Sequence, residues 1–207
     1  MNRNRELPTL FVMVKAPVAG AVKTRLAAMI GTAEALRFYR SSTASLLRRV
    51  GSDPRWRTVL AVSPDRYVGS RFWPANLPRI AQGQGNLGDR MQRLLDQPTG
   101  PRILIGSDVP GIRAGHIAEA FGVLARARLV FGPSEDGGFW LAGARRPTPR
   151  LFRDVRWSTP HALADTLANL RRPVGLAATL ADVDAEADWR RWRRGDLDAH
   201  QPEGSNR

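Results

Sequence analysis

Asp108 comes directly after an apolar run that has the composition of a buried strand. The stretch from Arg102 to Ile112 reads Arg-Ile-Leu-Ile-Gly-Ser-Asp-Val-Pro-Gly-Ile, and its β-branched residues favour a strand covered on both faces in a parallel sheet. Ligands of open α/β sheets collect at the carboxyl ends of the strands. A carboxylate there, followed by the stiff turn of Pro110, could hold a hard cation such as Mg²⁺. It could equally cap the next helix or form an Asx turn, so this stretch alone leaves both interpretations open.

Two lysines in one loop are the second feature that could take part in binding or catalysis. The chain has 32 basic and 19 acidic residues, which give a net charge of +13, and only Lys15 and Lys23 of the basic residues are lysines. A lysine ammonium is a compact charge that suits a phosphate oxygen. Together with Arg25, these lysines lie between a strand candidate and a helix candidate, a setting in which free backbone N–H groups favour anion binding. The alternative is a solvated basic turn. The arginines are spread over the whole chain, which leaves a nucleic-acid-binding module as a minor alternative.

A glycine pattern lies between Gln82 and Gly88. Gly83, Gly85 and Gly88 satisfy G-x-G-x-x-G, the fingerprint of dinucleotide-binding folds. That fingerprint belongs to the first βα turn, whereas here it follows the third strand candidate, so we reject a dinucleotide site. We interpret the segment instead as a wall on which a flat base lies against the backbone, with Gln82 reading its edge. A side chain added at Gly85 is then expected to block the nucleotide.

Two acidic segments follow in the second half of the chain. The run Glu135-Asp136-Gly137-Gly138-Phe139-Trp140 suggests a substrate wall, and its alternative is a hairpin turn with a buried Phe–Trp pair. The later run Asp182-Val183-Asp184 could offer a second carboxylate to a metal, because residues two apart on an extended segment share a face. These acids could equally start a helix, where the helix dipole favours negative charge.

Strands and helices are expected to alternate along the chain. Strand candidates occupy 7–14, 58–63, 79–82, 102–105, 129–132 and 174–179, and helices are expected at 24–50 with a break at Gly31, at 113–127, at 157–170 with Pro160 in the first turn, and after the last acidic run. This order predicts a three-layer α/β/α sandwich with a mainly parallel sheet. We expect one domain over residues 1–195 and a polar tail over 196–207.

Composition adds expectations about the setting. No apolar run reaches membrane-spanning length, the start does not read as a secretory signal, and the chain has no cysteine. The first two features predict a cytoplasmic protein. The lack of cysteine excludes disulfides and thiolate metal sites but does not identify a compartment.

An ordered set of motifs spans nearly the whole chain. It reads Lys-x-Pro-x-x-Gly-x-x-Lys-Thr-Arg-Leu, Gln-x-Gly-x-Leu-Gly-x-Arg-Met, Gly-Ser-Asp-x-Pro, Gly-Pro-x-x-Asp-Gly-Gly-Phe-Trp-Leu, Trp-Ser-Thr and Asp-x-Asp. With these motifs the sequence resembles the nucleotide-diphospho-sugar transferase superfamily, whose fold is the glycosyltransferase type A (GT-A) fold. It is most similar to the branch of phospholactate guanylyltransferase and the molybdenum-cofactor guanylyltransferases, many members of which are described only as glycosyltransferases, some beside arsenosugar biosynthesis genes.

The resemblance implies a role for each motif. It implies Asp108 and Asp184, the latter more than Asp182, as ligands of Mg²⁺ or Mn²⁺. Phosphates would be held by the first loop, whose Lys15, Lys23 and Arg25 form the catalytic set together with Asp108. Pro17 and Gly20 of the same loop would contact the nucleotide. The base would lie on Gln82, Gly83, Gly85, Leu87 and Gly88, and the substrate on Asp136, Gly137, Gly138, Trp140, Ser158 and Thr159.

The implied activity is a metal-dependent transfer that uses a nucleotide and a small-molecule acceptor. The preferred interpretation is nucleotidyl transfer from a nucleoside triphosphate to a small phosphorylated or carboxylate acceptor, with release of pyrophosphate. The alternative is glycosyl transfer from a nucleotide-diphospho-sugar. The cations of the first loop favour the former, because a triphosphate has more charge to hold.

Overall fold

One seven-stranded sheet organises the computed structural model, which describes residues 7–97, 100–170, 173–181, 183 and 186–194. Its strands are β1 (Thr9–Lys15), β2 (Arg57–Ser63), β3 (Arg79–Ala81), β4 (Arg102–Gly106), β5 (Leu129–Pro133), β6 (Phe139–Ala144) and β7 (Gly175–Leu176). Their order is β3-β2-β1-β4-β6-β5-β7, with β6 antiparallel to β4 and β5 and the other neighbouring pairs parallel. The strand that leads to Asp108 therefore lies at the centre of the sheet.

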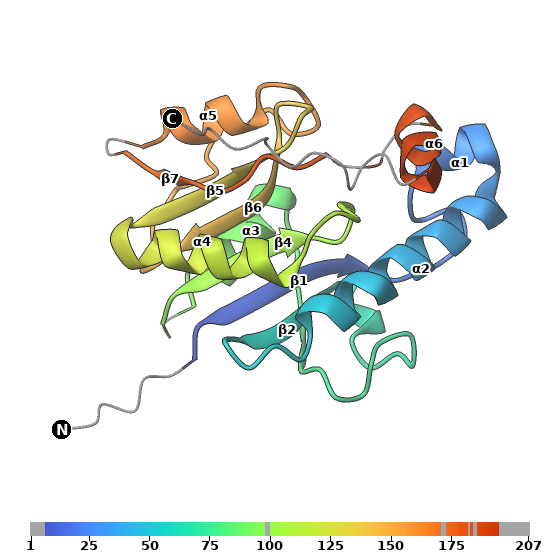
Figure 1. Cartoon of the computed structure of the whole chain (residues 1–207), viewed down its shortest axis with the longest axis horizontal. Helices are drawn as coiled ribbons and strands as arrows, with labels where there is room; N and C mark the ends of the chain where they lie inside the picture. The colour runs from blue at the N-terminus through green and yellow to red at the C-terminus, as the bar shows by residue number, and fades with distance from the viewer. Residues whose placement is uncertain (1–6, 98–99, 171–172, 182, 184–185, 195–207) are drawn as a thin grey trace, which may run out of the picture.

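Helices cover both faces of this sheet (Figure 1). They are α1 (Thr24–Ile30), α2 (Thr32–Val50), α3 (Leu87–Leu95), α4 (Ala114–Arg126), α5 (Ala162–Ala168) and α6 (Glu186–Arg194), with a 3₁₀ turn at Asp65–Tyr67. Side chains of α2 and α4 pack on one face, and those of α3 and α5 pack on the other. The predicted three-layer α/β/α architecture with a mainly parallel sheet is confirmed. Among the described residues, no helix combines the length and the apolar character needed to cross a membrane.

The central strands are apolar on both faces because both faces are covered. In β1, Leu10 and Val12 belong to the core under α2 and α4, whereas Phe11 belongs to the core under α3 and α5. In β4, Ile103 belongs to the core under α2 and α4, and Leu104 belongs to the core under α3 and α5. Such two-sided burial explains why these strands read as continuous apolar runs without polar alternation.

Three elements differ from the sequence-based expectations. Strand β6 was not among the strand candidates. Helix α3 was not expected, and it begins with a capping box in which the Asn86 side chain accepts a hydrogen bond from Asp89 N (3.0 Å) and Asp89 Oδ2 accepts one from Asn86 N (2.9 Å). The helix expected from residue 157 begins only at Ala162, with His161 at the N-cap. Ser158 has a left-handed φ of 60°, which keeps the preceding turn out of the helix.

The last described helix packs against the first two. Trp192 of α6 meets Phe38 of α2 edge to face, with 4.8 Å between ring centroids. Both rings belong to a small apolar cluster that contains the fully buried Leu26 and Val183. Helix α6 thus lies beside α1 and α2 (Figure 1), although it comes from the other end of the sequence. The predicted polar tail lies outside the described residues.

Arg102, at the start of β4, buries a guanidinium whose hydrogen bonds are incomplete, and this burial is expected to lower the stability of the fold. Its side chain is 1% exposed, and Nε and Nη1 find no hydrogen-bond partner in the described structure. Burial lowers the pKa of this guanidinium, an effect that the carboxylate of Asp96 partly opposes. We expect Arg102→Met, which keeps an unbranched side chain and removes the buried donors, to raise the free energy of unfolding by about 1–3 kcal/mol. Urea denaturation of both proteins measures this difference, and a decrease would show that the attraction to Asp96 outweighs the cost of burial.

Candidate active site

A cleft of about 830 Å³ opens at the carboxyl edge of the sheet, where parallel strands direct the loops that bind ligands. Its volume lies in the usual range of small-molecule sites. The lining comes from the end of β1, the start of α1, Tyr39 of α2, Gln82 after β3, the start of α3, the end of β4 with its following loop, the β5–β6 turn and the segment before α5. Eight segments that are far apart in the sequence therefore converge on one cleft.

Asp108 and Lys23 meet in this cleft. The Lys23 ammonium lies 3.1 Å from Asp108 Oδ1, and it also donates a hydrogen bond to the backbone oxygen of Val183 at 2.7 Å. The Lys23 side chain is 5% exposed and that of Asp108 is 55% exposed. Lys23 stands at the N-cap of α1 with a left-handed φ of 47°, a conformation that costs energy for a residue other than glycine. The predicted metal ligand and the predicted phosphate contact are thus ion-paired with each other.

Tyr39 is a cleft residue that sequence reasoning missed. Its hydroxyl accepts a hydrogen bond from Lys15 N (2.9 Å) and donates one to Lys15 O (2.8 Å), and it lies 3.4 Å from Ser107 Oγ. Burial raises the pKa of Tyr39, and the nearby charge of Asp108 adds to that rise. The neutral phenol therefore fixes the end of β1 against the end of β4. A tyrosine on the buried face of an amphipathic helix was the available signal, because its hydroxyl needs a partner.

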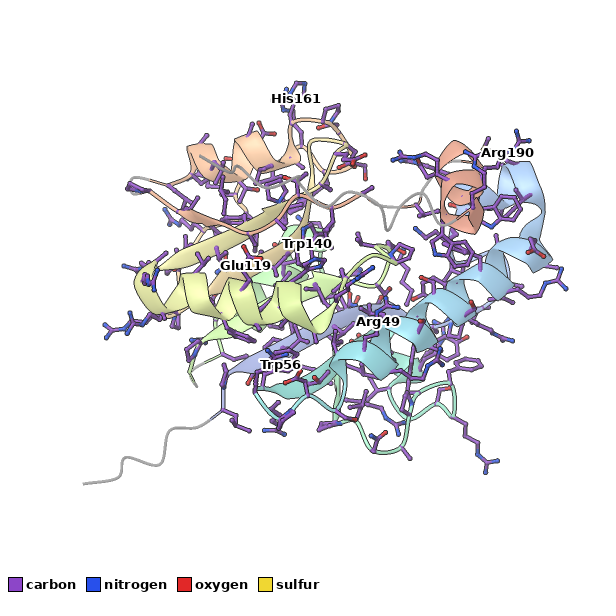
Figure 2. All side chains as sticks on the ribbon, in the orientation of Figure 1. Arg49, Trp56, Glu119, Trp140, His161 and Arg190 are labelled. Carbon is purple, nitrogen blue, oxygen red and sulfur yellow. The ribbon has the colours of Figure 1, made fainter. Side chains whose placement is uncertain are left out.

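Arg49 fixes the loop that follows Asp108. From α2 it donates hydrogen bonds to the backbone oxygens of Ile112 (2.9 Å) and Pro110 (2.5 Å) (Figure 2). These contacts are sixty and more residues apart in sequence. No local pattern in the chain predicted them.

The first loop reaches the cleft only in part. Lys15, Lys23 and Arg25 line it. Pro17 and Gly20 are not among the lining residues: the backbone oxygen of Pro17 accepts a hydrogen bond from Arg40 (3.3 Å), and Gly20 has a positive φ in an open turn. The three cations of the loop are thus brought together, and the other two residues shape the loop.

The glycine segment does not form the expected wall. Of the residues proposed for the base, Gln82 and Leu87 line the cleft, whereas the three glycines do not. A Cβ at Gly83 would meet the Arg93 guanidinium at 2.6 Å, one at Gly85 would meet Asp89 Oδ2 at 2.6 Å, and one at Gly88 would meet Phe152 Cβ at 3.0 Å. These glycines permit turns and close packing around α3, so a side chain at Gly85 would disturb the helix cap before it met a ligand.

Gln82 is also tied more tightly than expected. Its amide nitrogen donates to the backbone oxygens of Val14 (3.3 Å) and Ala61 (2.8 Å), and the residue is 4% exposed. Both amide hydrogens therefore join β1 to β2, which leaves no donor for a base edge. The exposed Leu87 is the apolar surface that this side of the cleft offers.

The acidic glycine segment is a hairpin turn whose surface lines the cleft. Residues 134–138 connect β5 to its antiparallel partner β6, and Asp136 Oδ1 accepts hydrogen bonds from Ser134 Oγ (2.6 Å) and Gly138 N (2.9 Å). Trp140 is 3% exposed on the α4 side of the sheet, where Nε1 donates to Ala178 O (Figure 2). The segment is therefore a hairpin turn, as the alternative interpretation predicted. Of the residues proposed to contact the substrate, those that line the cleft are Asp136, Gly138, Trp140, Ser158 and Thr159.

The described residues offer few candidate ligands for a metal at this site. They contain no cluster of three or more His, Cys, Asp or Glu side chains that could hold an ion, and Asp182 and Asp184 lie outside them. Asp108 and Asp136 both line the cleft. Because Mg²⁺ in nucleotide enzymes is held by one or two carboxylates together with substrate phosphates and waters, this set fits an ion that arrives with a nucleotide.

A family model described as "Uncharacterized protein conserved in bacteria (DUF2064)" matches residues 46–159, a little over half of the chain. The chain belongs to this DUF2064 family. The region that identifies a DUF2064 protein here contains Asp108, the α3 segment and the acidic hairpin, and it begins after the lysine loop. A comparison with curated proteins gave no match.

Solved structures share the fold of this DUF2064 chain. A "putative nucleotide-diphospho-sugar transferase" of Desulfovibrio desulfuricans G20 aligns with a TM-score of 0.82 at 24% identity, over 94% of this chain and 90% of that one. CMP:2-keto-3-deoxy-manno-octonic acid synthetase, solved with CTP, aligns with a TM-score of 0.56 at 12% identity, over 91% and 98%. Rv0371C of Mycobacterium tuberculosis H37Rv, solved with manganese, aligns with a TM-score of 0.52 at 16% identity, over 93% and 99%. The predicted nucleotide-diphospho-sugar transferase fold is confirmed.

Proposed function

We propose that the protein is a metal-dependent nucleotidyltransferase, which moves a nucleotidyl group from a nucleoside triphosphate to a small acceptor and releases pyrophosphate. The observation that carries this proposal is the cleft in which Asp108, at the end of the central strand, lies among Lys15, Lys23 and Arg25. A carboxylate next to several cations suits a polyphosphate that arrives with a divalent ion. The structural relatives solved with CTP and with manganese support this choice.

In this mechanism the chain positions the reactants and balances their charge. A phosphate or carboxylate oxygen of the acceptor attacks the α-phosphorus, and the bond from that phosphorus to the pyrophosphate oxygen breaks. No side-chain nucleophile is needed, because positioning and charge neutralisation suffice for such a step. Lys15, Lys23 and Arg25 hold the phosphates. A bound Mg²⁺ or Mn²⁺, held by Asp108 and by Asp184, would supply further neutralisation of the phosphate oxygens.

Two groups of lining residues suit different parts of the substrates. At the start of α3, Leu87 is 45% exposed and offers an apolar surface to the base, with Arg90 and Met91 also in the lining. The acidic hairpin, Ser158 and Thr159 line the cleft as well and are proposed to contact the acceptor. The guanidinium of Arg90 is held by Gly85 O (3.0 Å) and Ser63 Oγ (3.2 Å), so it is oriented before any ligand binds.

Glycosyl transfer from a nucleotide-diphospho-sugar is the second candidate, and one observation favours it. Within the described part of the chain, Asp136 has no cation at ion-pair distance, and its Oδ1 is fixed by Ser134 and Gly138. Such a carboxylate can accept a hydrogen bond from an acceptor hydroxyl. It would repel an acceptor that carries its own negative charge at that point.

Two substitutions of Lys23 distinguish nucleotidyl transfer from glycosyl transfer. If the cations hold a triphosphate, Lys23→Ala is expected to weaken binding of a nucleoside triphosphate by about tenfold more than binding of a nucleotide-diphospho-sugar, since a charge-assisted contact contributes about 1.5–3 kcal/mol. Lys23→Arg is expected to lower turnover, because the planar fork cannot occupy the same point. Calorimetric titration of both ligand classes measures the first effect, and equal losses for the two would favour glycosyl transfer.

A ligand panel tests the proposal directly. Thermal unfolding is measured with each common nucleoside triphosphate and nucleotide sugar, with and without Mg²⁺, since a ligand that binds the folded state raises the midpoint. We expect a triphosphate with Mg²⁺ to give the largest rise, and that triphosphate to release pyrophosphate when acceptors are added. Stabilisation by nucleotide sugars alone would overturn nucleotidyl transfer.

A gel-shift experiment tests the nucleic-acid alternative. A salt-sensitive mobility shift of random DNA that Asp108→Asn leaves unchanged would favour nucleic-acid binding instead.

A further inference from the structure

The Lys23 ammonium lies beside the Asp108 carboxylate, which is proposed to bind the metal. The ammonium lies 3.1 Å from Asp108 Oδ1 and 2.7 Å from Val183 O. The pair is asymmetric, because the lysine side chain is 5% exposed whereas the aspartate side chain is 55% exposed. The ammonium is therefore enclosed by protein, and the carboxylate remains open to the cleft.

Both partners of this pair are fixed by the same residue. Val183 accepts the Lys23 hydrogen bond through its backbone oxygen, and its backbone nitrogen donates to the backbone oxygen of Asp108 at 3.4 Å. The Val183 side chain is fully buried with Leu26 and Phe38. The contact between Lys23 and Asp108 is thus supported by a packed cluster.

A divalent ion bound to Asp108 would meet this ammonium at close range. Two positive charges a few ångströms apart repel each other, and the repulsion is larger where protein excludes water. Either the ion binds weakly or the ammonium moves away. A polyphosphate offers the displaced ammonium a new partner, because its oxygens carry several negative charges.

We infer that Lys23 and the divalent ion compete for Asp108, and that a bound triphosphate relieves the competition by taking Lys23 as its own partner. This inference rests on the metal-binding role that the proposed function gives Asp108. Its consequence is that metal and nucleotide bind synergistically: the metal alone binds weakly, and each ligand raises the affinity for the other by the same factor. Lys23 then acts as the residue that couples the two.

The first test measures Mn²⁺ binding without nucleotide, by electron paramagnetic resonance of the free ion. Lys23→Met is expected to bind Mn²⁺ at least about tenfold more tightly than the wild type, which corresponds to about 1.4 kcal/mol. Arg25→Met is the matched control: Arg25 lines the same cleft, yet in the described structure it makes no ion pair with Asp108. We expect less than about a threefold change for this control. Asp108→Asn is expected to weaken Mn²⁺ binding both in the wild type and in Lys23→Met.

Folding of the variants is checked separately. Circular dichroism and thermal unfolding show whether Lys23→Met retains the fold. Lys23→Gln is the second variant, since its amide can still donate a hydrogen bond to Val183 O while the positive charge is removed. Tighter Mn²⁺ binding in Lys23→Gln supports the inference even if Lys23→Met does not fold.

A second measurement uses the fact that the chain has two lysines. The ¹⁵N signals of their ammonium groups are observed while Mg²⁺ and then inorganic triphosphate are added. We expect Mg²⁺ with triphosphate to shift the Lys23 signal strongly, and Mg²⁺ alone to shift it only at much higher concentration. Equal responses with and without triphosphate would overturn the synergy.

The other possible results also distinguish between the inference and its alternatives. Unchanged or weaker Mn²⁺ binding in both Lys23 variants overturns the competition, and an equal gain in Arg25→Met shows that only overall charge matters. If Asp108→Asn binds Mn²⁺ like the wild type, the ion does not use Asp108 and the inference fails. If instead no nucleoside triphosphate is turned over while the Lys23 variants gain Mn²⁺ affinity as expected, the proposed reaction fails and the competition stands.

Discussion

Asp108→Asn is expected to lower turnover by about a hundredfold or more and to leave the fold intact. The loss of a metal ligand removes several kcal/mol of charge stabilisation, and each 1.36 kcal/mol corresponds to a factor of ten in rate. The fold should be preserved because the Asp108 side chain is 55% exposed and fills no core volume. Its backbone hydrogen bond from Val183 does not depend on the side chain.

The measurement combines the rate of pyrophosphate release with thermal unfolding. Glu119→Gln is the matched control, since Glu119 is an exposed carboxylate on α4, away from the lining of the cleft (Figure 2). It removes the same charge and is expected to leave the rate within about twofold, because the two exposed groups are screened from each other. A folded Asp108→Asn variant with full, metal-dependent turnover would contradict the assignment of Asp108 as a metal ligand.

Gly137→Ala is expected to lower the free energy of unfolding by about 2–4 kcal/mol, the sum of a strained backbone and an overpacked contact. Gly137 has a φ of +83°, and a Cβ there would overlap the backbone oxygen of Pro160. A backbone atom cannot rotate away as a side chain does, so either the hairpin or the 157–160 segment must move. Leu163 N donates to Gly137 O at 3.2 Å, which links the same turn to the start of α5.

This substitution should also reach the cleft, because the hairpin and the 157–160 segment contribute to its lining. Chemical denaturation gives the stability, and the KM for the acceptor gives the second effect. Gly122→Ala is the control: a Cβ at Gly122 meets nothing within 4 Å, and alanine is the better helix former by about 1 kcal/mol. If Gly137→Ala were as stable as the wild type, the contact between the hairpin and Pro160 would not be rigid.

The strands were the most predictable part of this protein. A strand covered on both faces must be apolar throughout, so β1, β2 and β4 could be located from composition alone. Helix α3 was missed because its preceding glycines suggested a ligand wall. Their actual role depends on Arg93, Asp89 and Phe152, which approach these glycines only after the chain has folded.

The site was predictable to the extent that residue type limits chemistry. The cations at 15, 23 and 25 and the carboxylate at 108 do line one cleft, as their positions at strand ends suggested. The contacts of Tyr39 and Arg49 could not be foreseen, because each joins segments more than twenty residues apart. The contacts of the Gln82 amide nitrogen could not be foreseen for the same reason, since its partners are carbonyls of two other strands.

The contact of Val183 with Lys23 and Asp108 has a consequence for synthesis on the ribosome. Chains emerge from their N-terminus at about 5–20 residues per second, so Lys23 and Asp108 leave the ribosome several seconds before Val183 and α6. During that interval the lysine lacks the carbonyl that holds it, and the apolar surface around Leu26 and Phe38 lacks its cover. A chain truncated before residue 183 therefore has most of the sheet but lacks the Val183 contacts with Lys23 and Asp108, and its apolar surface around Leu26 and Phe38 is uncovered.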